Sequence, residues 1–296
     1  MDEVEDYRSG NKETGPNVRI FFKEKTMAIV TISREFGSPG KEIGQQLAKR
    51  LDYAYIDRAQ ILERMRVLGK EWAKRGEEFD EHPPSMWERN DWSYQGFVAL
   101  SQSIILNFGR KDRVVLMGRG GNFLFKGIPY ALRVRITMPK EARIERVMKE
   151  DKLPRKTACW FVKKIDKEMT RAVYAIYGED WDDPTAYDML FDLAKKTETE
   201  IIQKIVTAAK ERDQFNTVEA RTILRLRAIA AKVKSAIATN PRFLVPTFDT
   251  EATAEGIVLC GIIHNQTEQR DIEKIAKRLA EDVSIQSELH YRGLVR

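Results

Sequence analysis

The segment MAIVTISREFGSPGKEIGQQLAKRL, residues 27–51, constrains the fold of this chain more than any other feature. It begins with a short, mostly apolar run, MAIVTI, of the kind found in strands buried on both faces of a parallel sheet. A loop with three small residues follows, and then a helix in which Ile43, Leu47 and Leu51 recur at a spacing of four. A buried strand that runs through a glycine loop into a helix predicts the first βαβ unit of an α/β domain.

Strand-like and helix-like segments alternate after this start, which predicts a three-layer α/β/α arrangement around a parallel sheet. Pro139 stands at the start of one predicted helix, where proline is favoured. Further strands are expected at residues 53–57, 113–118 and 132–137, and helices at residues 59–72, 98–109, 139–151, 155–176 and 198–212.

Beyond Gln214 the character of the sequence changes. Residues 218–240 form a basic amphipathic pattern that Pro241 stops, and residues 255–291 read as strand, Asn-Gln turn, helix and strand. We therefore expect a disordered, polar tail at residues 1–26, an α/β domain at residues 27–212, and a small α+β domain at residues 213–296.

Composition excludes several classes of protein. The 296 residues carry a net charge of +6, from 51 basic and 45 acidic residues that are interspersed, so we expect no nucleic-acid partner. The two cysteines and three histidines lie far apart, which argues against a zinc site. No apolar run is long enough to span a membrane and the N-terminus is unlike a signal peptide, so a cytoplasmic protein is expected.

The loop at residues 33–40 is close to the phosphate-binding pattern G-x-x-x-x-G-K-[ST], with two differences. Glu35 stands in place of the first glycine and Glu42 in place of the hydroxyl residue. Such a loop binds phosphate because backbone N–H groups at a helix N-terminus point at the anion and the helix dipole favours negative charge. Taken alone, the segment is equally compatible with an ordinary strand–turn–helix corner.

Four segments together resemble the cytidylate kinase-like family. They are TISREFGSPGKEIGQQLAKRLDYAYIDRAQIL, VVLMGRGGNFLF, ALRVRITMPKEARIERVM and GEDWDDPTAYDML, and the resemblance covers about residues 27–207. In that family a glutamate at the position of Glu35 is normal. The resemblance implies a nucleoside monophosphate kinase fold with a mobile lid, which uses ATP and Mg²⁺ to phosphorylate a nucleotide such as CMP or dCMP.

The resemblance also implies site residues. For the donor phosphates they are Gly37, Ser38, Gly40 and Lys41; for the acceptor nucleotide they are Asp57, Arg58, Arg119 and Asp166; and for charge neutralisation during transfer they are Lys41, Arg119, Arg143, Arg146 and Arg171. Alignment and charge neutralisation suffice for this chemistry, because the acceptor phosphate is already anionic. The metal ligands stay unassigned.

Three positions depart from the family pattern and leave a second interpretation open. Glu42 replaces the hydroxyl that binds Mg²⁺, Gly120 replaces an aspartate after Arg119, and Met169 replaces the arginine of an Asp-x-x-Arg motif. The alternative is therefore a nucleotide-binding regulator or sensor that has lost catalysis. The sequence leaves the acceptor and the oligomeric state open.

Two further regions allow more than one interpretation. Trp72, Trp87 and Trp92 either stack on a bound base or form a small apolar cluster of an insertion, with the cluster favoured, and Trp181 is expected to be structural. About residues 222–292 resemble a BON (bacterial OsmY and nodulation) domain. Its basic helix, with Arg221, Arg225, Arg227, Lys232 and Lys234, could contact peripheral lipid or a protein partner, or be an ordinary solvated face.

Overall fold

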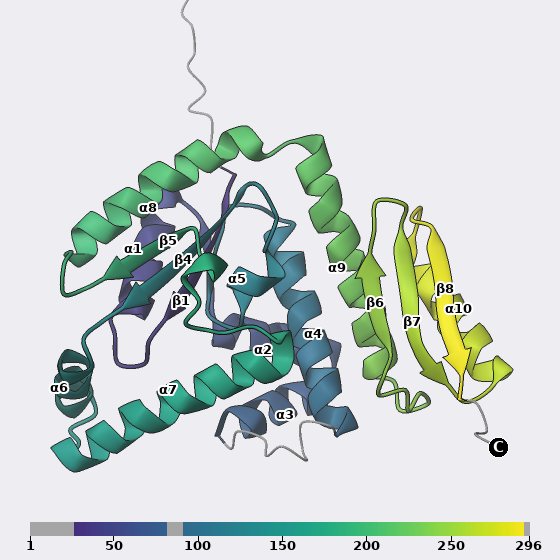
Figure 1. Cartoon of the computed structure of the whole chain (residues 1–296), viewed down its shortest axis with the longest axis horizontal. Coiled ribbons are helices and arrows are strands. Elements are labelled where there is room, and N and C mark those ends of the chain that lie inside the picture. Colours follow the sequence, from purple (N-terminus) through teal and green to yellow (C-terminus); the bar gives the residue numbers. More distant parts are fainter. Residues whose placement is uncertain (1–26, 82–90, 293–296) are drawn as a thin grey trace, which may run out of the picture.

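The computed structural model describes residues 27–81 and 91–292 (Figure 1). The predicted tail at residues 1–26 and Trp87 lie outside the described residues. No helix within the described ranges is long and apolar enough to cross a membrane.

A five-stranded parallel sheet forms the centre of the larger part of the molecule, with the strand order β2-β3-β1-β4-β5. β1 is central, with Ile29 opposite Val114 of β3 and Ala131 of β4. The strands are β1 (Ile29–Arg34), β2 (Ala54–Ile56), β3 (Val114–Met117), β4 (Ala131–Thr137) and β5 (Met189–Asp192). The predicted strands are present; β5 had no prediction because its half-exposed residues lack a clear period.

Helices cover both faces of this sheet, as the apolar runs predicted. Ile29 belongs to a core on the side of α2, α4 and α5, whereas its neighbour Val30 faces α1 and α8. The helices are α1 (Gly40–Leu51), α2 (Arg58–Leu68), α3 (Lys70–Glu81), α4 (Trp92–Gly109), α5 (Gly121–Leu124), α6 (Lys140–Glu150), α7 (Arg155–Tyr177) and α8 (Glu198–Arg212). Short 3-10 turns lie at Pro184–Ala186 and Asp213–Phe215.

The helix predicted over residues 59–72 is divided in the structure. α2 ends at Leu68 with Gly69 as its C-cap, and α3 starts directly afterwards. The predicted cluster of tryptophans is found among the described residues: the rings of Trp72 and Trp92 lie 5.6 Å apart, edge to face, and Trp72 is buried in the core beside α4. These two rings therefore support the packing of α3 on α4.

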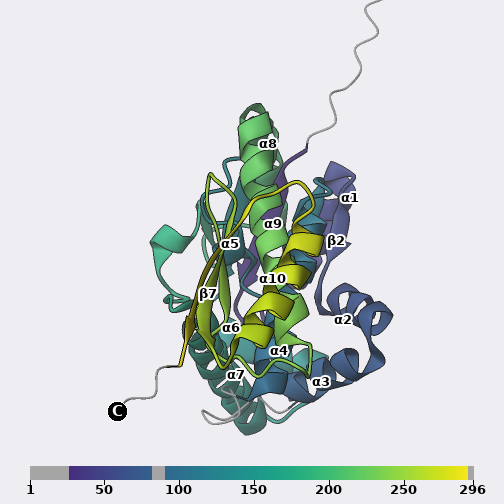
Figure 2. The same ribbon diagram turned by 90° about the vertical axis from the view of Figure 1, so that its right-hand side faces the viewer.

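The C-terminal residues form a three-stranded sheet with the order β6-β7-β8, and Figure 2 views the molecule from this side. β6 pairs antiparallel with β7. β7 pairs parallel with β8, and α10 connects these two strands along the chain. The element order confirms the predicted strand, turn, helix and strand, and adds β6. The bounds are α9 (Val218–Ala238), β6 (Asp249–Ala252), β7 (Ile257–Ile263), α10 (Gln266–Ala280) and β8 (Ile285–Tyr291).

Helix α9 belongs to both cores. Leu224 and Ala228 pack into the core formed with α4, whereas Val233 and Ile237 pack into the core of the C-terminal sheet. Figure 1 shows α9 standing between α4 and β6. The boundary predicted near residues 212–220 falls at the start of this shared helix.

Candidate active site

A cavity of about 370 Å³ opens at the carboxyl ends of β1, β2 and β3. Ligands of open parallel sheets bind at this edge. Helix α7 lies across the cavity and presents Met169, Ala172, Val173 and Ile176, whose spacing of three and four residues forms one stripe of the helix. The wall formed by α7 is therefore apolar.

The opposite wall, formed by the edge of the sheet, is charged. Arg34 ends β1, Lys41 lies in the first turn of α1, and Arg119 follows β3. Asp57 and Arg58 follow β2, and the Asp57 side chain caps α2 by accepting a hydrogen bond from the N–H of Ala59 at 2.8 Å. The structure thus brings together four of the predicted residues: Lys41, Asp57, Arg58 and Arg119.

Arg34 is a further cation of this wall that sequence reasoning did not select. Burial lowers the pKa of its guanidinium, the nearby charge of Arg119 lowers it further, and Tyr55 and Asp57 oppose this effect. Among the described residues no carboxylate forms an ion pair with Arg34. Two half-buried guanidinium groups at one cavity create a site that a bound anion stabilises.

Gly40 explains how Arg34 reaches the cavity. A Cβ atom at this position would lie 2.6 Å from Cβ and 2.7 Å from Cγ of Arg34, so only glycine lets the arginine side chain cross the start of α1. The first turn of α1 has no side-chain cap, since its N-cap is Pro39. Its first N–H groups therefore lack a helical partner and are available to phosphate oxygens.

The other loop residues hold the shape of the turn. Gly37 has a φ of +78°, and the Ser38 hydroxyl donates a 2.7 Å hydrogen bond to the Glu35 carbonyl. The Glu35 carboxylate accepts a 2.8 Å hydrogen bond from the N–H of Met138, which follows β4. Glu35 therefore ties the loop to the neighbouring strand, a role that a glycine could not fill.

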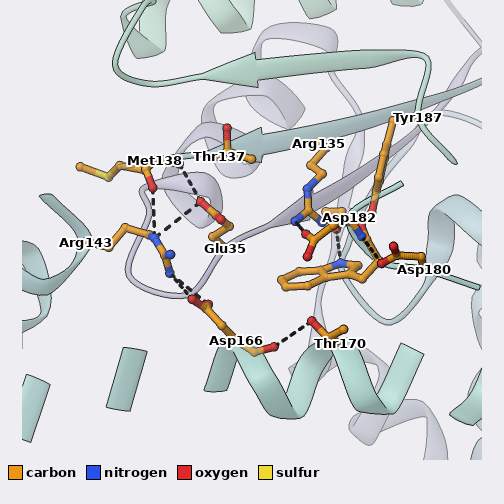
Figure 3. Close-up of polar contacts among 12 residues, drawn as sticks. Glu35, Arg135, Thr137, Met138, Arg143, Asp166, Thr170, Asp180, Asp182 and Tyr187 are labelled. Carbon is orange, nitrogen blue, oxygen red and sulfur yellow. Dashed lines mark hydrogen bonds and ion pairs between the residues drawn. The ribbon is translucent and has the colours of Figure 1, made fainter. Parts of the chain in front are cut away.

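Arg143 and Asp166, predicted to act on substrate, pair with each other (Figure 3). Arg143 is 4% exposed, and its Nη1 atom donates to both Asp166 oxygens at 3.0 and 2.9 Å and to the Phe36 carbonyl at 3.1 Å. Its Nε atom lies 3.5 Å from the Glu35 carboxylate. Neither residue lines the cavity. The pair instead links the loop, α6 and α7.

Arg146 and Arg171 also lie outside the cavity lining. Arg146 forms ion pairs with Glu42 at 2.7 Å and with Glu150 at 2.8 Å, so the carboxylate that replaces the usual hydroxyl is already occupied by a cation. Arg171 is exposed, because the stripe of α7 that faces the cavity runs through Ala172 and Val173 and leaves residue 171 on another side of the helix.

A second polar network surrounds Arg135 (Figure 3), and two of its members, Ser33 and Trp181, line the cavity. Arg135 of β4 is 3% exposed, donates to the Trp181 carbonyl at 2.9 Å, and lies 4.2 Å above the Trp181 ring. The indole Nε1 donates to the Ser33 hydroxyl at 2.8 Å. Asp182 and Tyr187 complete the contacts of Arg135. This network holds the segment after α7 against β1 and β4, in agreement with a structural role for Trp181.

Two uncharged donors line the cavity and were not predicted. Asn122 is 3% exposed, and neither its Nδ2 atom nor the Tyr55 hydroxyl has a hydrogen-bond partner among the described residues. Burial, and next the charge of Asp57, raise the pKa of Tyr55 to about 12, so its hydroxyl stays protonated. Asn122 follows β3 and Tyr55 lies in β2. This position near the ends of predicted strands was the only feature of the sequence that could have indicated a role in the site.

The cations predicted for lipid contact are mostly occupied within the chain. Arg221 pairs with Asp112 at 2.8 Å, Arg227 donates to the carbonyls of Leu124 and Lys126, and Lys234 pairs with Asp249 at 2.8 Å. Arg225 pairs with Asp282. Four cations of α9 therefore form contacts with neighbouring parts of the chain, and contact with lipid or a partner stays a prediction.

The sheet order, the loop before α1 and the cationic cavity define a P-loop α/β fold of the kinase class. The chain belongs to the cytidylate kinase-like family, whose model matches residues 29–195, more than half of its length. The match ends before α8, so the BON-like interpretation of the C-terminal residues stays a prediction. No curated protein matches the chain.

Solved structures resemble the same part of the chain. An uncharacterized protein from Eubacterium ventriosum is 19% identical, with a TM-score of 0.51, over 62% of this chain and 99% of its own. A shikimate kinase from Acinetobacter baumannii is 13% identical over 62% and 93%, with a TM-score of 0.36. A gluconokinase from Sinorhizobium meliloti is 13% identical over 64% and 96%, with a TM-score of 0.39. The first of these likenesses supports the fold alone.

Proposed function

We propose that this protein transfers the γ-phosphoryl group of ATP to a nucleoside monophosphate, with CMP or dCMP as the first candidates. The observation that carries this proposal is the pair Arg34 and Arg119, two guanidinium groups at one cavity, with no carboxylate of the described residues paired to Arg34. An acceptor phosphate would relieve their repulsion and lie beside Lys41.

The chain's own residues can bind, orient and shield the reactants. The uncapped first turn of α1 and Lys41 would hold the donor phosphates, and Arg34, Arg58 and Arg119 the acceptor phosphate. The apolar stripe of α7 would exclude water from the transferred group. Asn122 and Tyr55 would donate hydrogen bonds to the acceptor's uncharged part.

The residues fit a Mg²⁺ ion that is bound mainly by the phosphates. The described residues contain no group of three potential metal ligands, and Glu42 is paired with Arg146. Asp57 supplies one carboxylate at the cavity, and Mg²⁺ in kinases commonly takes one or two carboxylates together with phosphate oxygens and water. When bound, the ion would neutralise charge that develops on the transferred group.

A nucleotide-binding regulator without catalysis is the second candidate. Two observations favour it. Glu42 forms an ion pair with Arg146, and Met169 places a thioether at the cavity where the family pattern has an arginine. A regulator would bind the nucleotides and leave ATP intact.

A coupled assay of ADP release separates the two candidates. We expect ADP formation from ATP and Mg²⁺ that depends on one of CMP, dCMP, UMP, AMP or GMP. Lys41→Ala should reduce it at least about 100-fold, because it removes charge stabilisation in the transition state. Lys49→Ala, at the exposed far end of the same helix, is the matched control and should act as wild type. Nucleotide binding by calorimetry without acceptor-dependent ADP would establish the regulator instead.

A further inference from the structure

The turn that carries Arg119 has an unusual backbone. Gly118, Arg119 and Gly120 have φ values of +69°, +56° and +70°, so three successive residues adopt the left-handed conformation. Glycine does so at little cost, but arginine does not. The surrounding structure must therefore hold Arg119 in place.

Tyr177, the last residue of α7, supplies this hold. Its hydroxyl donates a 2.9 Å hydrogen bond to the Arg119 carbonyl. Its ring stacks on Phe123 of α5 with 5.1 Å between the ring centres. One side chain thus joins the end of α7 to the arginine turn and to α5.

Gly120 is shaped to receive the same ring. A Cβ atom at Gly120 would lie 2.2 to 2.4 Å from three atoms of Tyr177, including its hydroxyl oxygen. Any larger residue here would expel the tyrosine. The glycine that departs from the family pattern therefore has a reason in this chain: it makes room for Tyr177.

We propose that Tyr177 is a positioning residue that couples helix α7 to Arg119, so that Arg119 is correctly placed for the acceptor phosphate only while α7 covers the cavity. The identity of the acceptor in this proposal rests on the proposed function. The contact between Tyr177 and Arg119 is independent of that function. Binding of the acceptor and closure of α7 then stabilise each other, because both depend on the same turn.

Calorimetric titration of the full chain with CMP tests this coupling. Tyr177→Phe keeps the ring and removes the hydroxyl, and should weaken CMP binding about 3- to 10-fold, the range expected for one hydrogen bond. Binding of the ATP analogue AMP-PNP should not change. Tyr174→Phe, an exposed tyrosine one turn earlier on α7, should leave both affinities unaltered.

A double-mutant cycle shows whether Tyr177 acts through Arg119. In an Arg119→Met background, Tyr177→Phe should have no further effect on CMP binding, since the group that it positions is absent. An undiminished loss in that background, or CMP binding by Tyr177→Phe equal to wild type, would overturn the proposal.

Amide hydrogen exchange of the protein without ligand tests the coupling through Tyr177 independently of the proposed kinase function. If the wild type binds no nucleoside monophosphate, the proposed function fails and the coupling is judged from exchange alone. Tyr177→Phe should then speed exchange in residues 118–124 and in the end of α7 together, whereas Tyr174→Phe should not. Unchanged exchange in residues 118–124 would refute the coupling on its own.

Discussion

The two walls of the cavity differ in chemistry and in origin. The wall at the edge of the sheet gathers Arg34, Lys41, Arg58 and Arg119 from the ends of three strands and the segments that follow them. The wall on α7 is one continuous helical stripe without a charge, from Met169 to Ile176. The charged groups are thus attached to the rigid sheet, and the apolar groups to the helix that covers it.

This difference suggests that the two walls have separate roles, phosphate recognition at the sheet and water exclusion at α7. Rigid cations keep their geometry while substrates enter, which suits phosphate recognition. An apolar cover adds no charge of its own, but strengthens the charges opposite by excluding water. The ion pair between Arg143 and Asp166 connects the two walls from outside the cavity.

The largest expected effect comes from breaking that connection. Arg143→Met leaves Asp166 and Glu35 without their buried cation and should lower the free energy of unfolding by about 3 kcal/mol in urea titrations. Arg155→Met, which breaks an exposed pair with Glu141, should cost at most about 1 kcal/mol. Equal losses in the two variants would show that the buried pair does not join the walls.

The charged wall is tested by removing its unpredicted cation. Arg34→Met should lower kcat/KM for the acceptor about 100-fold, with little change in melting temperature, because Arg34 forms no ion pair with the described residues. Arg171→Met, on the exposed side of α7, should remain within about twofold of wild type. A large loss in the second variant would mean that α7 contributes charge after all.

The smallest effect concerns the pH dependence of Tyr55. Burial and then the charge of Asp57 raise its pKa to about 12, so the protonated phenol is favoured in the folded protein. The associated stabilisation is fully present below the ordinary value of 10.0 and is lost as the pH rises through about 12. Acceptor affinity should therefore show no step from this residue between about pH 8 and about pH 10. A fall in that range that Tyr55→Phe abolishes would contradict the assignment.

Much of the fold followed from local patterns. The apolar runs of β1, β3 and β4 and the periodic spacing of α1, α7 and α8 led to the observed elements, since such patterns record which faces are buried. The division of the helix at Gly69 and the half-exposed strands β5 and β6 did not, because short exposed segments carry a weak period.

The arginines show where residue patterns reach their limit. Arg143 and Arg34 are equally basic in the sequence, yet one pairs with a carboxylate 23 residues away and the other faces the cavity. Whether a cation is paired depends on which acidic groups the fold brings within a few ångströms of it. Neither residue spacing nor composition predicts the distance between two charges in the folded chain.

The sequence by itself determined a parallel α/β sheet with a phosphate loop after its first strand, because burial periods and glycine positions are local properties of the chain. Only the tertiary structure decided which cations reach the cavity, that Gly120 accommodates Tyr177, and that α9 is shared between two cores. Those outcomes depend on contacts between residues far apart in the chain, and such contacts exist only after the layers have packed.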